Sequence, residues 1–363
     1  MIISLTGCWD YHEMVDFSDI TCVAIDKGEK KRYKTTVEGK KFTPKIDIDV
    51  KPVLYESEGD TIFEALLSTI SSSGRKLYIG SLQTIIISEE IANEGISEVL
   101  NFFSRSNKAR FLIGVYVARG TDAASLIKDT ALYSVFAGYE IAEAGDQIFQ
   151  FLGYENEHHL YQVMDKLYDD YKYPVLTVLE LIDSPKDKKT FKIEGLAAFR
   201  DEKLAGYLPS NLIPSYGLWI NHYKNGMLSI PYEDKGYIGI EIYESSSRRK
   251  FTYIDGKVHL YNNVKLEIGY SDNGTTLYGI DIIKEKDVIR VTEQFLQEQT
   301  TNLHKYVKEE LKIDILEIEE FYRKYNYKHW KKIHDEYDFL NDTIVHFEFN
   351  IVIRGDGEIR VKK

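Results

Sequence analysis

The spacing of apolar residues changes along the chain, and this change restricts the fold more than any other feature. The segment Leu77–Ile87 contains the unbroken run Ile85-Ile86-Ile87, which is typical of a strand buried on both faces. From Val345 to Ile353, apolar residues alternate with polar ones, which is typical of a strand with one buried face. We therefore expect a helix-covered α/β sheet at the front of the chain and an antiparallel, one-sided sheet at the back.

Strand and helix signals alternate in the front part. Strands are predicted over residues 20–25, 45–55, 77–87 and 111–117. Thr61 and Glu64 have the spacing of a capping box, which predicts a helix beginning there and ending at Gly74. Ser88 is suited to cap a second helix that runs to about Phe103. This part therefore has the pattern of helices packed on a sheet.

The middle and last parts have different patterns. Residues 121–160 have helical spacing, and strands over 175–181 and 191–199 flank a polar loop that indicates a hairpin. Further strands are predicted over 237–243, 258–270 and 276–283, with a tight turn at Asp272-Asn273-Gly274. A long amphipathic helix is expected from Asp287 to Leu311. We predict a multidomain α+β protein with mixed and antiparallel sheets, each packed with helices, and domains over 9–120, 121–210 and 211–363.

Composition excludes some classes of function. The 363 residues carry a net charge of −12, which argues against binding nucleic acid or an anionic lipid surface by electrostatics. A lysine-rich stretch from Lys27 to Lys34 is an exception, and we interpret it as a solvated hairpin tip. No apolar run approaches the roughly 18 residues that a membrane-spanning helix needs. Any attachment to a membrane must therefore come from another feature.

Such a feature lies near the N-terminus. Leu5, Thr6, Gly7 and Cys8 have the order of a bacterial lipobox, in which the cysteine thiol receives a diacylglyceryl group after cleavage before Cys8. Two acyl chains anchor a protein stably, whereas one holds it only marginally. Residues 1–8 are then the remnant of a signal peptide, and we expect a longer segment upstream. A chance cysteine in an apolar strand is the alternative.

We find no pattern of catalytic or metal-binding residues. The sequence has no phosphate-binding glycine loop, no G-x-S-x-G motif and no H-E-x-x-H motif. His158 and His159, near Glu155 and Glu157, are the nearest approach to a metal cluster, but adjacent helical residues point to different sides. No carboxyl pair stands out as isolated among apolar residues. Cys22 is expected to be buried as a small apolar residue. We predict a protein that is not an enzyme and has no metal or cofactor.

The chain resembles the C-subunit lipoproteins of bacterial spore germinant receptors, the Ger(x)C family. The resemblance begins at the lipobox and Trp9-Asp10 and covers nearly the whole chain. The matching segments in the first half are 25–28, 59–66, 77–80, 88–92 and 99–103. In the second half they are 195–199, 203–208, Tyr322-Arg323 and Trp330. The sequence departs from the family pattern at Ser81, Asn101, Tyr337 and Arg354, which bears on subgroup and not on membership.

The resemblance implies a lipid-anchored subunit of a nutrient receptor, on the outer face of the spore inner membrane. It implies two integral membrane partners, the A and B subunits, and three α+β domains. We expect a non-catalytic scaffold or interaction role in germination, without direct binding of the germinant. The alternative is a solute-binding lipoprotein of a transport system, which should have two similar α/β lobes. The halves of this chain differ in type.

Overall fold

The structure is a computed structural model that forms two compact units. It describes residues 17–43, 49–106, 112–130, 135–152, 158–184, 188–232, 236–273 and 284–356. The first unit comprises the chain up to Ala142, with His159–Tyr161 and Leu179–Lys192. The second comprises Glu143–His158, Gln162–Val178 and the chain from Ile193. The division into three domains stays a prediction.

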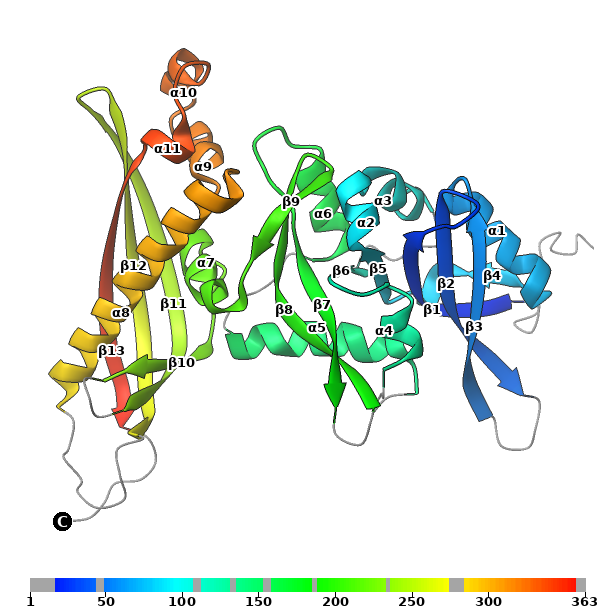
Figure 1. Cartoon of the computed structure of the whole chain (residues 1–363). Coiled ribbons are helices and arrows are strands. Elements are labelled where there is room, and N and C mark those ends of the chain that lie inside the picture. Colours follow the sequence, from blue (N-terminus) through cyan, green and yellow to red (C-terminus); the bar gives the residue numbers. More distant parts are fainter. Residues whose placement is uncertain are drawn as a thin grey trace, which may run out of the picture. The chain divides into compact units, whose positions relative to one another are not determined.

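A mixed sheet forms the centre of the first unit (Figure 1). Its strands include β1 (Phe17–Lys27), β2 (Tyr33–Thr43), β3 (Asp49–Gly59), β4 (Lys76–Tyr78), β5 (Thr84–Ser88) and β6 (Gly114–Ala118). The order is β3-β2-β1-β5-β6, and β4 pairs with the start of β1. The three N-terminal strands are antiparallel, whereas β1, β5 and β6 are parallel. All five residues of β5 are buried, as the isoleucine run predicts.

The first unit contains several helices, and the first two of them begin at the capping residues predicted from the sequence. The helices are α1 (Ile62–Ser73), α2 (Glu89–Glu94), α3 (Ser97–Ser104), α4 (Ser125–Lys128) and the start of α5 (Ala137–Leu152). Thr61 Oγ1 accepts a hydrogen bond from the Glu64 amide at 3.1 Å, and Gly74 ends α1 with φ 66°. A left-handed residue there satisfies the final carbonyls of a helix.

Two elements predicted as continuous are divided in the structure. Strand 77–87 is interrupted by a 3₁₀ turn, η2 (Ile79–Ser81), so that β4 and β5 are separate. The predicted helix from Ser88 to Phe103 is broken at Gly95, whose φ of 138° is not helical. Periodicity alone does not register a short stretch that leaves the regular conformation, which explains both differences.

The hairpin that follows contributes to both units. It consists of β7 (Val175–Ser184) and β8 (Lys188–Arg200), and its distal part, Leu179–Lys192, belongs to the first unit. In the second unit β8 pairs antiparallel with β9 (Lys203–Leu208), with Leu196 opposite Leu208. Helix α6 (Leu160–Leu167) precedes the hairpin. The hairpin expected on either side of the polar loop is therefore confirmed.

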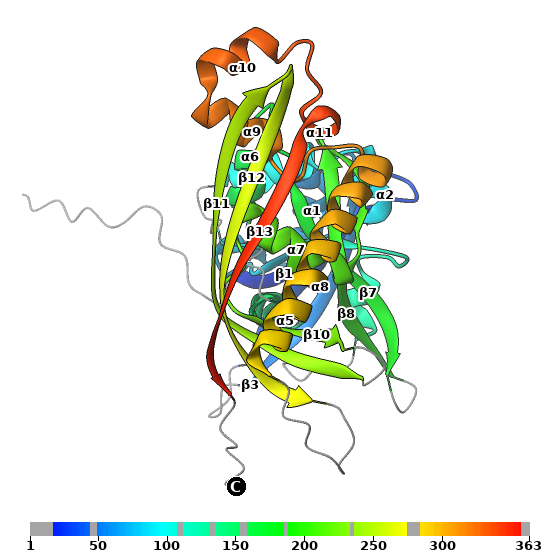
Figure 2. The same cartoon turned by 90° about the vertical axis from the view of Figure 1, so that its left-hand side faces the viewer.

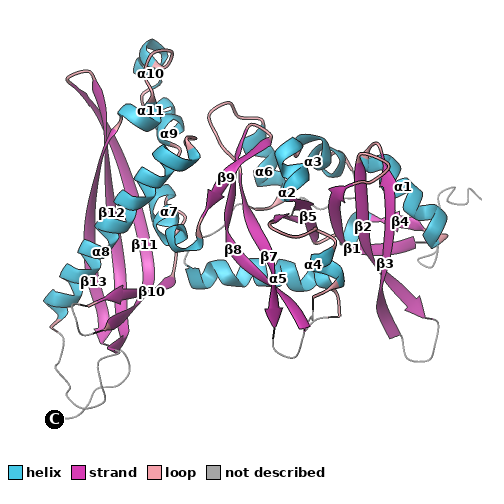
Figure 3. Ribbon diagram, viewed as in Figure 1, coloured by secondary structure: helices cyan, strands magenta, loops and turns pink. Residues whose placement is uncertain are grey.

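The second unit contains a four-stranded sheet and most of the remaining helices (Figure 3). The strands are β10 (Gly226–Pro231), β11 (Tyr237–Ile254), β12 (Lys257–Asn273) and β13 (Ile344–Asp356), in that order. The helical segments are η3 (Ser210–Leu212), α7 (Ile213–Ile220), α8 (Glu285–Tyr306), η5 (Val307–Leu311), α9 (Ile318–Tyr325), α10 (Tyr327–Ile333) and α11 (Phe339–Asp342).

Helix α8 lies along one face of this sheet (Figure 2). Val288 and Leu296 of α8 pack in one apolar core with Ile240 of β11, Leu266 of β12 and Phe349 of β13. Residues on the opposite face of β13, such as His346, are exposed. The predicted amphipathic helix and the one-sided closing strand are therefore confirmed.

The direction of β13 differs from the expectation of an antiparallel domain. Strand β13 runs parallel to β12, with Leu260 opposite Val345. The helices α8 to α11 lie between these two strands in the sequence, and a crossover of this length lets the chain return in the same direction. The strand predicted over 276–283 lies outside the described residues.

Candidate functional site

The lipobox residues Leu5, Thr6, Gly7 and Cys8 lie outside the described residues, whose first member is Phe17. Lipidation of Cys8 therefore stays a prediction. Cys22, the other cysteine, lies in β1 and is fully buried, as expected for a small apolar residue.

A connector in the second unit contains a buried acidic side chain. It runs from Lys312 to Glu317, between the π-helical turn η5 and α9. Lys312 and Glu317 have φ values of 56° and 57°, a conformation that costs energy for residues with a Cβ. Between them lies the sequence Ile313-Asp314-Ile315-Leu316, which is buried throughout. The fold therefore places one carboxyl inside an apolar turn.

Asp314 is only partly supplied with hydrogen-bond donors. Its side chain is 7% exposed, and Oδ2 accepts a hydrogen bond from the Glu319 amide at 2.9 Å, at the start of α9. Oδ1 has no hydrogen-bond partner among the described residues. Burial raises the pKa of Asp314 to about 6, against the opposing effect of the Glu319 and Ile318 backbone amides, and the nearby charges of Glu317 and Glu319 raise it further. At neutral pH the pocket therefore contains a buried negative charge.

Glu317, three residues later, is in the opposite situation. The ammonium of Lys166 lies 3.0 Å from Glu317 Oε1, and the Lys166 side chain is only 6% exposed. Burial alone would raise the pKa of Glu317, but Lys166, together with the charges of Arg249 and His222, keeps the pKa below its ordinary value. Two neighbouring acidic residues of one connector therefore differ because only one has a cation beside it.

Asp314 lines a pocket of about 410 Å³ in the second unit. Its acidic lining residues are Asp314, Glu319, Asp335, Glu336 and Asp338. Lys312 is the only basic residue in this lining, and Tyr173 and Phe339 add aromatic surface. Glu319 accepts a hydrogen bond from the Trp330 indole at 3.0 Å, and burial raises its pKa. We call this feature the acidic pocket.

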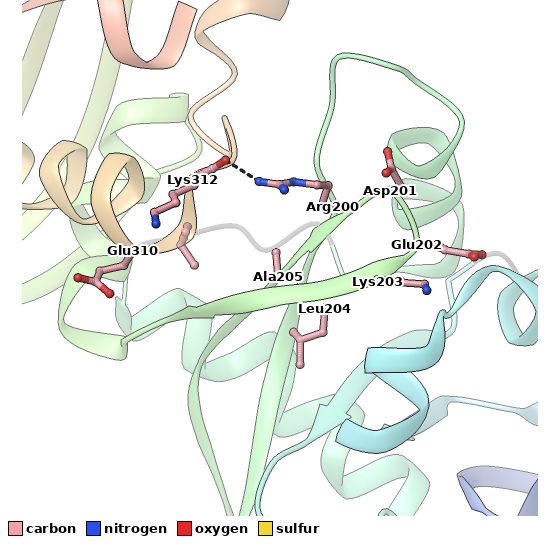
Figure 4. Close-up of a pocket in the computed structure, with 9 residues that line it drawn as sticks. Arg200, Asp201, Glu202, Lys203, Leu204, Ala205, Glu310 and Lys312 are labelled. Atoms are coloured by element: carbon pink, nitrogen blue, oxygen red, sulfur yellow. Dashed lines mark hydrogen bonds between the residues drawn. The ribbon is translucent and has the colours of Figure 1, made fainter. Parts of the chain in front are cut away.

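A second pocket, of about 530 Å³, lies on the β8–β9 turn and the end of η5 (Figure 4). Arg200 donates a hydrogen bond to the Lys312 carbonyl at 2.8 Å, which is drawn as a dashed line. Its charged lining residues are Arg200, Lys203 and Lys312 against Asp201, Glu202 and Glu310. Because these charges balance, this pocket has no clear electrostatic preference for a ligand.

The sequence singled out no carboxyl with a shifted pKa, whereas burial raises the pKa of both Asp314 and Glu319 in the structure. The sequence signal was a single aspartate inside an apolar run, but its isolation depends on residues distant in sequence. Neither carboxyl lies beside a nucleophile in the described contacts. The chemistry that this arrangement offers is attraction of a positive charge.

The two histidines considered as metal ligands belong to different units. His158 is buried in the second unit, and its Nε2 lies 3.9 Å from Asp146 Oδ1. The sequence did not indicate this acid–imidazole proximity. His159 belongs to the first unit, and Glu155 and Glu157 lie outside the described residues.

The helices of the described residues include none that is both long and apolar enough to cross a membrane. Helix α8, with 22 residues, is the longest of them, and it carries charged residues along its exposed face.

Comparison with known proteins identifies the family. Residues 10–181 match the spore germination protein N-terminal domain, and residues 194–357 match the spore germination B3/GerAC-like C-terminal domain. The chain is 22% identical to spore germination protein B3 of Bacillus subtilis, over 99% of this chain and 96% of that protein. It is 27% identical to spore germination protein KC of the same organism, over 35% of this chain and 33% of that protein.

A solved structure supports the same assignment at the level of the fold. The crystal structure of the GerBC protein matches with a TM-score of 0.57 and 17% identity, over 92% of this chain and 97% of that one. With two family domains that together span nearly its whole length, the chain belongs to the spore germination B3/GerAC-like family and has a role in spore germination.

Proposed function

We propose that this chain is the lipid-anchored C subunit of a spore nutrient germinant receptor, with a diacylglyceryl group on Cys8. The proposal rests on the match of both family domains. In this chain the lipobox ends at Cys8, two residues before the first matched residue, Asp10. The proposed location is the outer face of the spore inner membrane.

In this proposal the chain has an interaction role and catalyses no reaction. Its partners are the integral membrane A and B subunits of the receptor. A lipid anchor keeps the folded units beside these partners and raises their effective concentration there. The net charge of −12 opposes adsorption to anionic lipid, so contacts with protein are favoured. The matches to germination proteins leave the transporter alternative without support.

The proposal is tested by comparing wild-type spores with two mutant strains. One has an in-frame deletion of the gene, and the other carries Cys8→Ala at the native locus. We expect deletion to abolish germination in response to particular nutrients. Germination is monitored by the loss of optical density and by the release of dipicolinate. Cys8→Ala should largely reproduce the deletion and should remove labelling by radioactive palmitate. The matched control is Cys22→Ala, because Cys22 is fully buried in β1 and is unavailable for acylation.

Two results would contradict the proposal in different ways. Normal germination of the deletion strain with every nutrient, after removal of any paralogous genes, would exclude the receptor role. Palmitate labelling that survives Cys8→Ala would exclude the anchor at Cys8 and leave the receptor role intact.

A further inference from the structure

One carboxylate oxygen of a residue that lines the acidic pocket has no hydrogen-bond donor among the described residues. Asp314 is more than nine-tenths buried and lines the pocket. Its Oδ2 binds the Glu319 amide, whereas Oδ1 has no partner among the described residues. Buried carboxylate oxygens in native proteins are almost always paired, and leaving one unpaired is costly. A donor that approaches through the pocket would remove this cost.

The nearby buried cations are engaged elsewhere. Lys166 forms its ion pair with Glu317. Arg249 donates hydrogen bonds to the carbonyl oxygens of Trp219 and Leu316. Lys312, the only basic residue of the lining, also borders the second pocket, and Figure 4 shows its side chain extending toward Glu310. Arg323 and His334 lower the pKa of Glu319, and His334 lies 3.4 Å from Asp335, but neither residue donates a hydrogen bond to Oδ1 of Asp314.

The geometry favours an organic cation over a bare metal ion. Ca²⁺ and Mg²⁺ require several oxygen ligands at about 2.0–2.6 Å. No three carboxylate or imidazole ligand atoms of the described lining residues lie within 4.8 Å of one another. The volume of about 410 Å³ and the aromatic rings of Tyr173 and Phe339 suit a cation attached to a short carbon chain, because aromatic faces attract cations.

We propose that the acidic pocket binds a primary ammonium or guanidinium group, which donates a hydrogen bond to Oδ1 of Asp314. The group comes either from a small amine or from a lysine or arginine side chain of a partner protein. The inference concerns the second unit alone and does not depend on the germination role or on the anchor.

The test uses the full 363-residue chain at about pH 7.5 and saturation-transfer difference NMR, which detects weak ligands. The probes are n-butylammonium, n-butylguanidinium and the neutral isostere n-butanol. We expect both cations to bind and the alcohol to bind at least about tenfold more weakly, as the loss of a charge-assisted hydrogen bond implies.

Three variants locate the binding. Asp314→Asn should weaken binding of the cations about tenfold or more, and it keeps an oxygen that can accept from the Glu319 amide. Asp335→Asn is the matched control, because this acidic residue of the lining is 87% exposed, and it should change affinity by no more than about twofold. Glu319→Gln provides a second variant inside the pocket if Asp314→Asn fails to fold.

A further arm separates the two sources of the cation. The peptide acetyl-Gly-Lys-Gly-amide is compared with its norleucine analogue. Binding of the lysine peptide at the strength of butylammonium supports a partner side chain, and binding of butylammonium alone supports a small amine. Equal binding of butanol and butylammonium, or equal losses for Asp314→Asn and Asp335→Asn, would overturn the proposal.

Discussion

Buried carboxyls in the two units are treated in different ways. In the first unit, Glu38 is 2% exposed, and its two oxygens accept hydrogen bonds from the Ala137 and Gly138 amides at 2.8 and 3.0 Å. Asp26 accepts from the Ala123 and Ala124 amides at 2.7 and 3.0 Å. In the second unit, Asp314 has one partnered oxygen and one without a described partner.

This difference separates a carboxylate with a purely structural role from one that can still accept a hydrogen bond from a ligand. The Glu38 carboxylate sits at the N-terminus of α5, where the helix dipole favours a negative charge, and Thr21 adds a hydroxyl donor. Nothing remains for a ligand to satisfy there. Asp314 has the same burial but retains a free acceptor beside a pocket. Burial of a carboxyl is therefore not sufficient to indicate a binding site. The indication is a carboxylate oxygen that has no hydrogen-bond donor.

The largest effect is expected for Glu38→Ala. Removing the carboxylate leaves the Ala137 and Gly138 amides and the Thr21 hydroxyl without their acceptor. We expect the first unit to lose roughly 4 kcal/mol of stability. Hydrogen exchange of the β1, β2 and α5 amides measures this loss. Glu38→Gln, which keeps one acceptor oxygen, should lose less, and equal losses would show that packing and not hydrogen bonding dominates.

The second-largest loss of stability is expected for Lys166→Met. It leaves the buried Glu317 carboxylate without its ion-pair partner, and removing one member of a buried pair costs roughly 3 kcal/mol. Urea unfolding followed by tryptophan fluorescence measures the effect in the second unit, which contains Trp219 and Trp330. The double variant Lys166→Met with Glu317→Gln should recover part of the loss. No recovery would mean that the charge on Glu317 is not the cause.

Asp314→Asn should have an effect of the opposite sign. The pKa of Asp314 is raised from 3.8 to about 6, so between these pH values the folded state binds a proton that the unfolded state has released. Stability is therefore fully present below pH 4 and is lost as the pH rises through 6. At pH 8 the asparagine variant should be more stable than the wild type by about 3 kcal/mol, because each unit between the two pKa values corresponds to about 1.4 kcal/mol.

Urea unfolding of both proteins from pH 4 to pH 8 measures this difference. The two curves should converge near pH 4 and separate above it. Parallel curves over the whole range would show that Asp314 does not titrate in this window.

The smallest effect is expected for Glu319→Gln. The amide oxygen of glutamine can still accept from the Trp330 indole, while a like charge near Asp314 is removed. We expect a gain of less than about 1 kcal/mol at pH 8 and a lower pKa of Asp314. Carboxyl ¹³C NMR of Asp314 measures the shift. An unchanged pKa would show that burial alone raises it.

Many elements of the fold follow from local patterns. The isoleucine run of β5, the caps of α1, the β7–β8 hairpin and the stripe of α8 were all predicted, because each depends on residues close in sequence. The interruptions at Ile79–Ser81 and at Gly95 were not predicted, since a short stretch outside the regular conformation leaves the apolar periodicity intact. The parallel direction of β13 was also missed, because strand direction depends on the path of the whole crossover.

The acidic pocket was not predictable in the same way. Asp314 is marked in the sequence only as an aspartate among isoleucines and a leucine. Its neighbours Tyr173 and Asp338 come from more distant segments, and the compensation of Glu317 depends on Lys166, 151 residues earlier. Whether a buried charge is balanced is a property of three-dimensional proximity, which sequence spacing does not encode.

The sequence by itself determined the family, the α+β class and most secondary structure, because short motifs and apolar periodicity are local in the chain. It also supplied the prediction of an anchor at Cys8, which rests on four adjacent residues. Only the tertiary structure decided which buried carboxyls are satisfied and which is open. The electrostatic energy of a buried carboxyl depends on the solvent, donors and charges around it, and folding brings these together from all parts of a unit.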